Sequence, residues 1–209
     1  MKSVLLAVAL PVVFLAQAVA EPAGYVLLYN GKDLSGWQTT GNWLPQKNGM
    51  LLIHPRPGEE GWQRYSDYLW TQKKYKDFML DLQYSYPADG NSGVFFRVGD
   101  VQDPVNTGIE VQILVSSEHK GEMTHHDHGG VIRTVGASEN RSLPPGLWNR
   151  MIITCQGQHL QVQLNGKKIV DLQLETSAMK DRPDAGFIGL QDHGEPNNIR
   201  FRNIRIKPL

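Results

Sequence analysis

Apolar and polar residues alternate with a period of two along most of the chain after residue 20. In segment 78–86 one face collects five large apolar or aromatic residues, Phe78, Leu80, Leu82, Tyr84 and Tyr86, while polar residues such as Asp81 and Gln83 fall between them. Successive strand residues point to opposite faces of a sheet, so this alternation predicts a half-buried strand. Helical periodicity is not sustained anywhere in residues 21–209. The pattern therefore predicts an all-β protein.

Similar short segments recur between clusters of Gly, Pro, Asn and Asp, which predicts many short strands. We expect them near residues 50–54, 68–71, 78–86, 92–97, 108–115, 131–135, 149–156, 159–164, 167–173, 186–192 and 199–207. Asn165-Gly166 tolerates the positive φ angles of a type I′ turn, which predicts a hairpin over residues 159–173. Antiparallel strands without crossover helices predict two packed sheets, a β-sandwich or jelly roll.

The amino terminus has the organisation of a secretory signal peptide. A basic start, Met1-Lys2, precedes an apolar run over residues 4–15, and Ala18-Val19-Ala20 stands before Glu21. These features predict a cleaved signal over residues 1–20 and an exported protein, either periplasmic or extracellular. Residues 21–209 are then expected to form a single β-sandwich domain.

Charge and cysteine content narrow the possible partners. The chain has 21 basic and 21 acidic residues, whereas nucleic-acid binding and anionic membrane surfaces require a basic excess. We therefore expect neither nucleic acid nor membrane as a partner, and the sequence leaves the oligomeric state open. Cys155 is the single cysteine, so no intramolecular disulfide can form, and its apolar neighbours predict a buried small residue.

Polar side chains interrupt two of the predicted strands. In segment 108–115, Glu110 and Gln112 alternate with β-branched residues, so they share one face, roughly 6–7 Å apart. If segment 92–97 is the neighbouring strand, Arg97 lies near Glu110 and forms a cross-strand ion pair. Two interpretations stay open: a solvated sheet face with an ordinary ion pair, or the centre of a binding groove.

Three further features carry candidate chemistry. In segment 186–194, Gln191 and His193 share a face with Gly189, where a glycine lets a ligand or another backbone approach closely. His126 and His128 point the same way if extended, which makes a divalent metal ion a candidate cofactor, although a site needs three or four converging ligands. Trp62 lies in a Pro/Gly-rich loop and is a candidate for stacking on a sugar ring.

A series of short motifs spans nearly the whole of residues 21–209. In chain order they are Tyr29-Asn-Gly-Lys-Asp-Leu-Ser-Gly-Trp37, Phe78-Met-Leu, Gly90-Asn-Ser-Gly-Val-Phe-Phe-Arg97, Gly108-Ile-Glu-Val-Gln-Ile113, Trp148-Asn149, Asn165-Gly166, Gly189-Leu-Gln-Asp-His-Gly194 and Phe201-Arg-Asn-Ile204. Their order resembles the 3-keto-disaccharide hydrolase family, also described as 3-keto-glucoside 1,2-lyase or 3-keto-2-hydroxy-glucal hydratase. The resemblance implies a concanavalin-A-like jelly roll, related in shape to lectins and laminarinase-type glucanases.

The resemblance also implies a reaction on a 3-keto-glucoside. A ketone at C3 acidifies the C2 hydrogen, so that a base can remove it and the C1 substituent leaves by β-elimination; hydration of the glucal completes net hydrolysis. The candidate bases are Glu110 and His193, and the candidate oxyanion stabilisers are Arg97, Gln112 or a bound cation. The candidate substrate-binding residues are Asn91, Gln112, Gln191 and Trp62.

Two alternatives come from other functional classes. A carbohydrate-binding module without chemistry has the same kind of sandwich, since a fold does not determine a function. A two-carboxylate glycoside hydrolase needs a second acid about 5–9.5 Å from the first, whereas the neighbour of Glu110 on the predicted face is the amide Gln112. The partner is therefore expected to be a small-molecule or oligosaccharide substrate.

Overall fold

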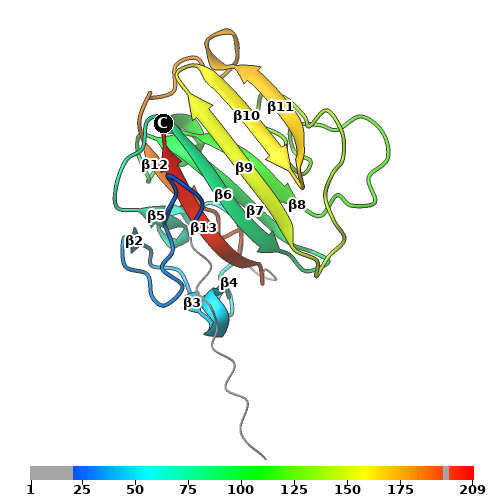
Figure 1. The fold of residues 1–209 in the computed structure, drawn as a ribbon. Helices are drawn as coiled ribbons and strands as arrows, with labels where there is room; N and C mark the ends of the chain where they lie inside the picture. Colours follow the sequence, from blue (N-terminus) through cyan, green and yellow to red (C-terminus); the bar gives the residue numbers. More distant parts are fainter. Residues whose placement is uncertain (1–20, 195–197) are drawn as a thin grey trace, which may run out of the picture.

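Two antiparallel sheets stack face to face in the computed structural model, which describes residues 21–194 and 198–209 (Figure 1). The larger sheet has the order β11-β10-β9-β6-β13-β4-β3, with β1 paired to β13. Its strands are β1 (Val26–Leu27), β3 (Trp43–Pro45), β4 (Leu51–Ile53), β6 (Phe78–Ser85), β9 (Asn149–Gln156), β10 (His159–Leu164), β11 (Lys167–Gln173) and β13 (Arg200–Pro208). The all-β, two-sheet prediction is confirmed.

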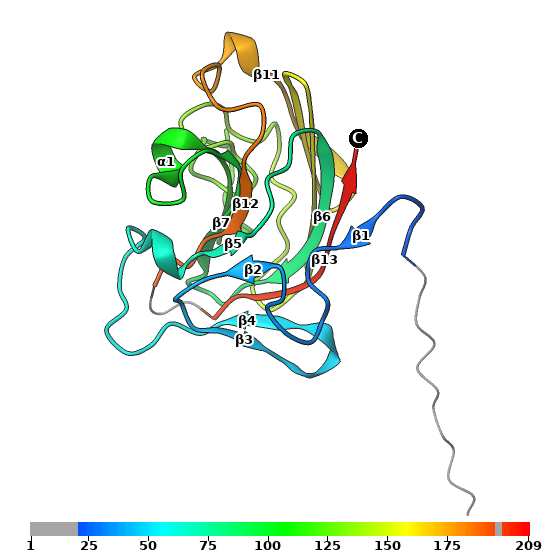
Figure 2. The same cartoon turned by 90° about the vertical axis from the view of Figure 1, so that its left-hand side faces the viewer.

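The smaller sheet has the order β2-β5-β12-β7-β8. Its strands are β2 (Trp37–Gln38), β5 (Leu69–Thr71), β7 (Asn91–Val98), β8 (Ile109–Leu114) and β12 (Phe187–Leu190). Helical turns connect several strands: η1 (Lys47–Gly49), η2 (Tyr65–Asp67), α1 (Pro104–Thr107) and η3 (Leu174–Thr176). Figure 2 shows the two sheets edge-on, with α1 on the outer side of the smaller sheet, away from the larger one.

The core lies between the two sheets and follows the predicted alternation. The apolar face of β6 and the following Tyr86 are buried, and on β8 the residues Ile109, Val111 and Ile113 are buried in the same cluster. Cys155 is also fully buried there, as predicted, and burial raises the pKa of its thiol to about 11. Side chains at the intervening positions of β8 consequently point to the outer face of the smaller sheet.

The hairpin over residues 159–173 and the segment 131–135 differ in how they match the predicted strands and turns. Asn165 and Gly166 both have positive φ and join β10 to β11, so the predicted hairpin is confirmed. The strand predicted at residues 131–135 is wrong: Val131 and Val135 form an isolated bridge that closes a tight turn. β1, β2 and β3 were not predicted, because runs of two or three residues are too short to display a period.

The predicted signal segment, residues 1–20, lies outside the described residues, so export stays a prediction. Within the described part of the chain, no helix has both the length and the apolar character that crossing a membrane requires.

Candidate functional site

A groove of about 300 Å³ lies on the outer face of the smaller sheet. The strands β7 and β8 and the segment after β12 contribute its polar floor, and loops contribute its walls. Its lining residues are Trp62, Asn91, Val105, Glu110, Gln112, His126, Ile132, Arg133, Gln191 and His193. The groove thus brings together most of the candidate residues that the sequence pattern identified.

Glu110 occupies the floor because β7 leaves room for it. In the β7–β8 register Gly93 pairs with Gln112 and Phe95 pairs with Glu110. A Cβ atom on Gly93 would lie 2.1 Å from Oε1 of Glu110, so the carboxyl group rests on the bare glycine backbone. The glycine therefore positions the carboxyl group as well as giving it space.

The environment of Glu110 favours its protonated form. Its Oε1 atom is enclosed and has no hydrogen-bond partner among the described residues. Burial raises the pKa of this carboxyl from 4.5 to about 8, and the nearby guanidinium of Arg133 opposes that shift. A carboxylate with a pKa near the working pH is a stronger base than an exposed one, and such a value is typical of general acid–base catalysts.

Amide side chains with fixed orientations surround Glu110. Gln112 donates from Nε2 to Oδ1 of Asn91 at 2.9 Å. Gln191 donates from Nε2 to the hydroxyl of Tyr68 at 3.0 Å, and that hydroxyl donates to the carbonyl of Trp62 at 2.8 Å. Oε1 of Gln191 is buried without a partner in the described structure. This series of hydrogen bonds leaves Oε1 of Gln191 as an acceptor for a hydroxyl group of a ligand.

His193 lies on the far side of the groove from β8 and is only partly exposed. Burial lowers the pKa of its imidazole, with a smaller contribution from Arg64 in the same direction. Beside it, the buried Asp192 accepts from the backbone N–H of Gly194 at 2.9 Å and faces Nη2 of Arg64 at 3.3 Å. These contacts fasten the His193 segment to the loop that carries Trp62.

The prediction that Arg97 lies beside Glu110 is wrong. A β-bulge between β7 and β12 places Arg97 at a φ of 51°, which breaks the alternation after Phe96. The guanidinium is therefore buried toward the other sheet, where Nη2 donates to the carbonyl of Gly157 at 2.6 Å and lies 3.6 Å from Asp77. These contacts identify Arg97 as a structural residue away from the groove.

The prediction that His126 and His128 form a metal pair is also wrong. Residues 124–130 form turns, so His126 lines the groove while His128 is buried in the core. Nδ1 of His128 donates to the carbonyl of Leu114 at 2.7 Å, and the hydroxyl of Tyr84 donates to Nε2 at 2.5 Å, so neither nitrogen is available to a metal. No group of three or more potential ligands is found among residues 21–194 and 198–209.

The space above Gly189 belongs to an aromatic side chain. A Cβ atom there would lie 2.1 Å from the Trp70 ring, so the close approach predicted at Gly189 is filled by the protein itself. Trp70 stacks on Tyr68 and contacts Phe95 edge-on. Trp62 lies at the exposed end of this aromatic series, 6.0 Å from the ring of Tyr65, where it can cover a ligand in the groove.

Two residues of the site were missed in the sequence. Arg133 lies in the turn after an irregular stretch, and Tyr68 lies directly before β5, in a segment whose period indicated only burial. No local motif points to Arg133. For Tyr68, a tyrosine hydroxyl in a segment predicted to be buried was a usable signal, because such hydroxyls usually have a partner.

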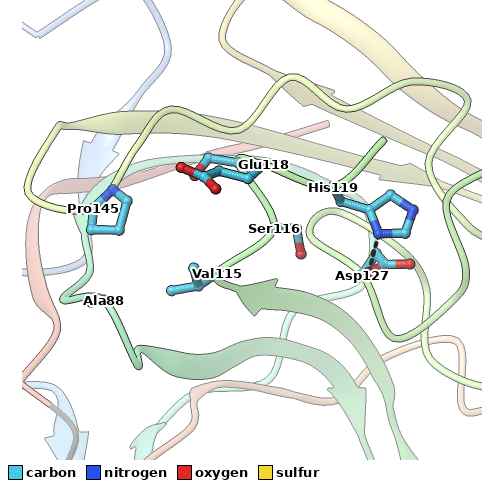
Figure 3. Close-up of a pocket in the computed structure, with 8 residues that line it drawn as sticks. Ala88, Val115, Ser116, Glu118, His119, Asp127 and Pro145 are labelled. Carbon is cyan, nitrogen blue, oxygen red and sulfur yellow. Dashed lines mark ion pairs between the residues drawn. The ribbon is translucent and has the colours of Figure 1, made fainter. Parts of the chain in front are cut away.

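A second cavity of about 340 Å³ lies beyond the end of β8 (Figure 3). His119 and Asp127 face each other at one end, 3.9 Å apart, and Ala88 and Pro145 lie at the other. The Ser116 hydroxyl accepts from the backbone N–H of His128, and Nε2 of His119 faces the carbonyl of Glu122. The histidine is therefore oriented away from the serine, and the set does not form a nucleophilic triad.

Comparisons with known proteins identify the family of the chain. Residues 24–207 match the family model described as the 3-keto-alpha-glucoside-1,2-lyase-like domain. The chain belongs to this family. It is 26% identical to a 3-keto-disaccharide hydrolase of Bacteroides thetaiotaomicron, with 92% of this chain and 81% of that protein covered.

Solved structures of other proteins share the fold of this member of the 3-keto-alpha-glucoside-1,2-lyase-like family. A solved Parabacteroides distasonis protein, named as a candidate glycosyl hydrolase, is 29% identical, with a TM-score of 0.74 and coverage of 88% of this chain and 99% of that one. The carbohydrate binding module CBM66 of Bacillus subtilis, 15% identical with a TM-score of 0.54 over 81% of this chain and 94% of its own, shares the fold alone. These likenesses confirm the predicted jelly-roll sandwich.

Proposed function

We propose that the protein acts on 3-keto-glucosides by β-elimination followed by hydration. The observation that carries this proposal is the enclosed carboxyl group of Glu110 on a floor of oriented amide groups. Family membership and the name of the Bacteroides relative support a carbohydrate substrate. The groove volume of about 300 Å³ suits a small ligand of sugar size.

Glu110 is the base in this proposal. Its carboxylate takes the proton from C2, and the electrons of the C–H bond form an enolate with the C3 ketone. Collapse of the enolate forms the C1–C2 double bond and expels the C1 oxygen as an alcohol after protonation. Water then adds across that double bond, its hydroxyl to C1 and a proton from Glu110 to C2. The net reaction is hydrolysis, and Glu110 regains its starting state.

The remaining groove residues bind and orient the sugar. Gln191 accepts from a hydroxyl group, Asn91 and Gln112 form a polar pair beside Glu110, and Trp62 covers the ring. The imidazolium form of His193 gives its proton to the departing oxygen, and its lowered pKa makes it a stronger acid for this step. The resulting neutral imidazole takes the remaining proton of the attacking water, which restores His193.

Elimination fits the groove better than a two-carboxylate mechanism. Of the described residues that line it, Glu110 is the one acid, and the carboxylate of the neighbouring Asp192 is turned toward Arg64. Hydrolysis of an unoxidised glycoside uses two carboxylates that flank the bond. A binding module without chemistry stays the second candidate, because CBM66 shares the fold.

The test compares a 3-keto-glucoside with its parent glucoside. The proposal expects cleavage of the keto-sugar alone, with deuterium incorporation at C2 in D₂O. Glu110→Gln should lower the rate by about 10²–10⁴-fold, whereas Glu118→Gln, in the second cavity, should not. Binding of the keto-sugar without turnover or exchange would support the binding module, and cleavage of the parent would support the two-carboxylate mechanism.

Export is a separate part of the proposal. The pattern of residues 1–20 supports it, and the mature protein is expected to begin at Glu21. Sequencing the amino terminus of protein recovered from the periplasm or medium tests this; a protein that keeps Met1 inside the cell would contradict it.

A further inference from the structure

Arg133 is fixed relative to Glu110 by the backbone. The turn that carries it runs along the free edge of β8, where Ile132 donates its N–H to the carbonyl of Glu110 at 3.0 Å. The bridge between Val131 and Val135 closes this turn. Arg133 itself has a φ of 62°, a left-handed conformation that a non-glycine residue adopts only when its surroundings impose it.

Neighbouring side chains hold Arg133 in this place. Its backbone N–H donates to Nδ1 of His125 at 3.0 Å, and Nη1 donates to Oδ1 of Asn106 at 3.1 Å. Asn106, the third residue of α1, is in turn anchored because its amide donates to Asp103 at 3.0 Å. A guanidinium has five N–H donors, so this arrangement orients the group and leaves other donors for a ligand.

The charge of Arg133 is not neutralised by an ion pair. Among the described residues no carboxylate forms a salt bridge with it, although Arg56, Arg64, Arg97, Arg141, Arg150 and Arg205 all have such partners. Arg133 lines the groove together with Glu110, whose Oε1 has no partner. A permanent cation therefore faces the site where the proposed reaction develops negative charge.

We infer that Arg133 stabilises the enolate oxygen at C3 during the proposed elimination, a role for which Arg97, Gln112 and a bound cation were the candidates in the sequence. When Glu110 takes the C2 proton, the electron pair moves onto the C3 oxygen, and a guanidinium N–H donates to that oxygen. As the C1–O bond breaks, the C3 ketone re-forms and the negative charge leaves with the departing oxygen, so Arg133 neither gains nor loses a proton. The inference rests on the proposed function and names the electrophile of the same site.

The experiment uses Arg133→Met and Arg133→Lys, with Arg141→Met as the control. Arg141 is an exposed arginine paired with Glu139 outside the groove, so its replacement removes the same charge from the chain. Loss of an oxyanion donor typically costs about 10²–10³-fold in kcat. We expect that loss for Arg133→Met with a smaller change in KM, an intermediate loss for Arg133→Lys, and wild-type rates for Arg141→Met.

Two further readouts separate catalysis from a structural role. Deuterium exchange at C2 reports enolate formation directly, and it should slow in Arg133→Met in parallel with turnover. Carbon NMR of the Glu110 carboxyl should show its titration moving to higher pH in that variant, because the opposing cation is gone. Melting curves show whether each variant folds. If Arg133→Met does not fold, the exchange and turnover rates of Arg133→Lys decide whether Arg133 has a catalytic role.

The outcomes distinguish this inference from the proposed function. If the wild-type protein converts the keto-sugar and Glu110→Gln is impaired, while both Arg133 variants exchange and turn over at wild-type rates, the role of Arg133 is overturned and the function survives. If the wild-type protein neither exchanges nor cleaves any keto-glucoside, the function and the inference fail together.

Discussion

Gly93 and Glu110 lie so close across the β7–β8 pair that a Cβ atom on the glycine would come within 2.1 Å of Oε1 of the carboxyl group. The contact joins a backbone position to the proposed base. The contact leaves no room for a side chain at position 93, at the centre of the polar face. The next residue of β7 on that face is Phe95, which packs in the outer aromatic cluster.

Gly93→Ala should therefore impair catalysis without unfolding the protein. The added methyl group forces the carboxyl group to move, and a displacement of about 1 Å can cost about 10²-fold in rate. Steady-state kinetics on a 3-keto-glucoside measure this effect. Gly99→Ala is the matched control, because its Cβ atom would meet a proline side chain at 3.1 Å outside the groove. Equal rates for both variants would show that the carboxyl position is not critical.

The raised pKa of Glu110 predicts that Glu110→Gln, which is expected to lower activity, increases stability at high pH. Between pH 4.5 and about 8 the folded protein holds a proton on Glu110 that the unfolded chain has released. Stability consequently falls as pH rises through this window, by about 1.4 kcal/mol per pH unit for this group. Glu110→Gln has no such proton to lose.

Glu110→Gln should thus be more stable than the wild type at pH 8, and the difference should vanish near pH 4.5. Urea denaturation at several pH values measures it, with Glu118→Gln as the control. A constant difference across the whole range would show that burial does not raise the pKa of Glu110.

Tyr68→Phe tests the orientation of Gln191. Without the hydroxyl, the amide of Gln191 loses the acceptor that directs Nε2 away from the groove. The amide can then present either end to the ligand, and we expect KM to rise about fivefold with a smaller change in kcat, since a net hydrogen bond contributes about 1 kcal/mol. Tyr75→Phe, in another part of the structure, is the control. An unchanged KM would exclude Gln191 from the binding of the substrate.

How far the sequence predicted this site depends on the regularity of each strand. Glu110 and Gln112 were predicted on one outer face because β8 alternates without interruption. Arg97 was misplaced because a bulge at a non-glycine residue is a tertiary effect that periodicity does not contain. Arg133 was missed for a related reason, since its position depends on a loop that pairs with the edge of β8.

Arg97→Met separates the two roles considered for that residue. The structure predicts a loss of stability of roughly 1–3 kcal/mol, because the buried Arg97 side chain loses its charge-assisted hydrogen bond to the carbonyl of Gly157. The kcat of the folded variant should equal that of the wild type. Chemical denaturation and kinetics on the same sample measure both; a large fall in kcat with intact stability would restore the catalytic role predicted from sequence.

His128 predicts a dependence on pH in the acid range. Burial lowers the pKa of this imidazole from 6.5 to about 4, although its hydrogen bond to the Leu114 carbonyl opposes the shift. Between these values the unfolded chain binds a proton that the folded protein excludes, so stability falls as pH decreases, by about 1.4 kcal/mol per pH unit.

His128→Gln does not titrate, and its loss of packing adds an offset that is constant with pH. The stability difference between wild type and variant should therefore shrink from pH 6.5 to pH 4, as measured by urea denaturation. His159→Gln, at an exposed ion pair with Asp171, is the control for the loss of a histidine elsewhere. A difference that stays constant with pH would show that His128 titrates alike in the folded and unfolded states.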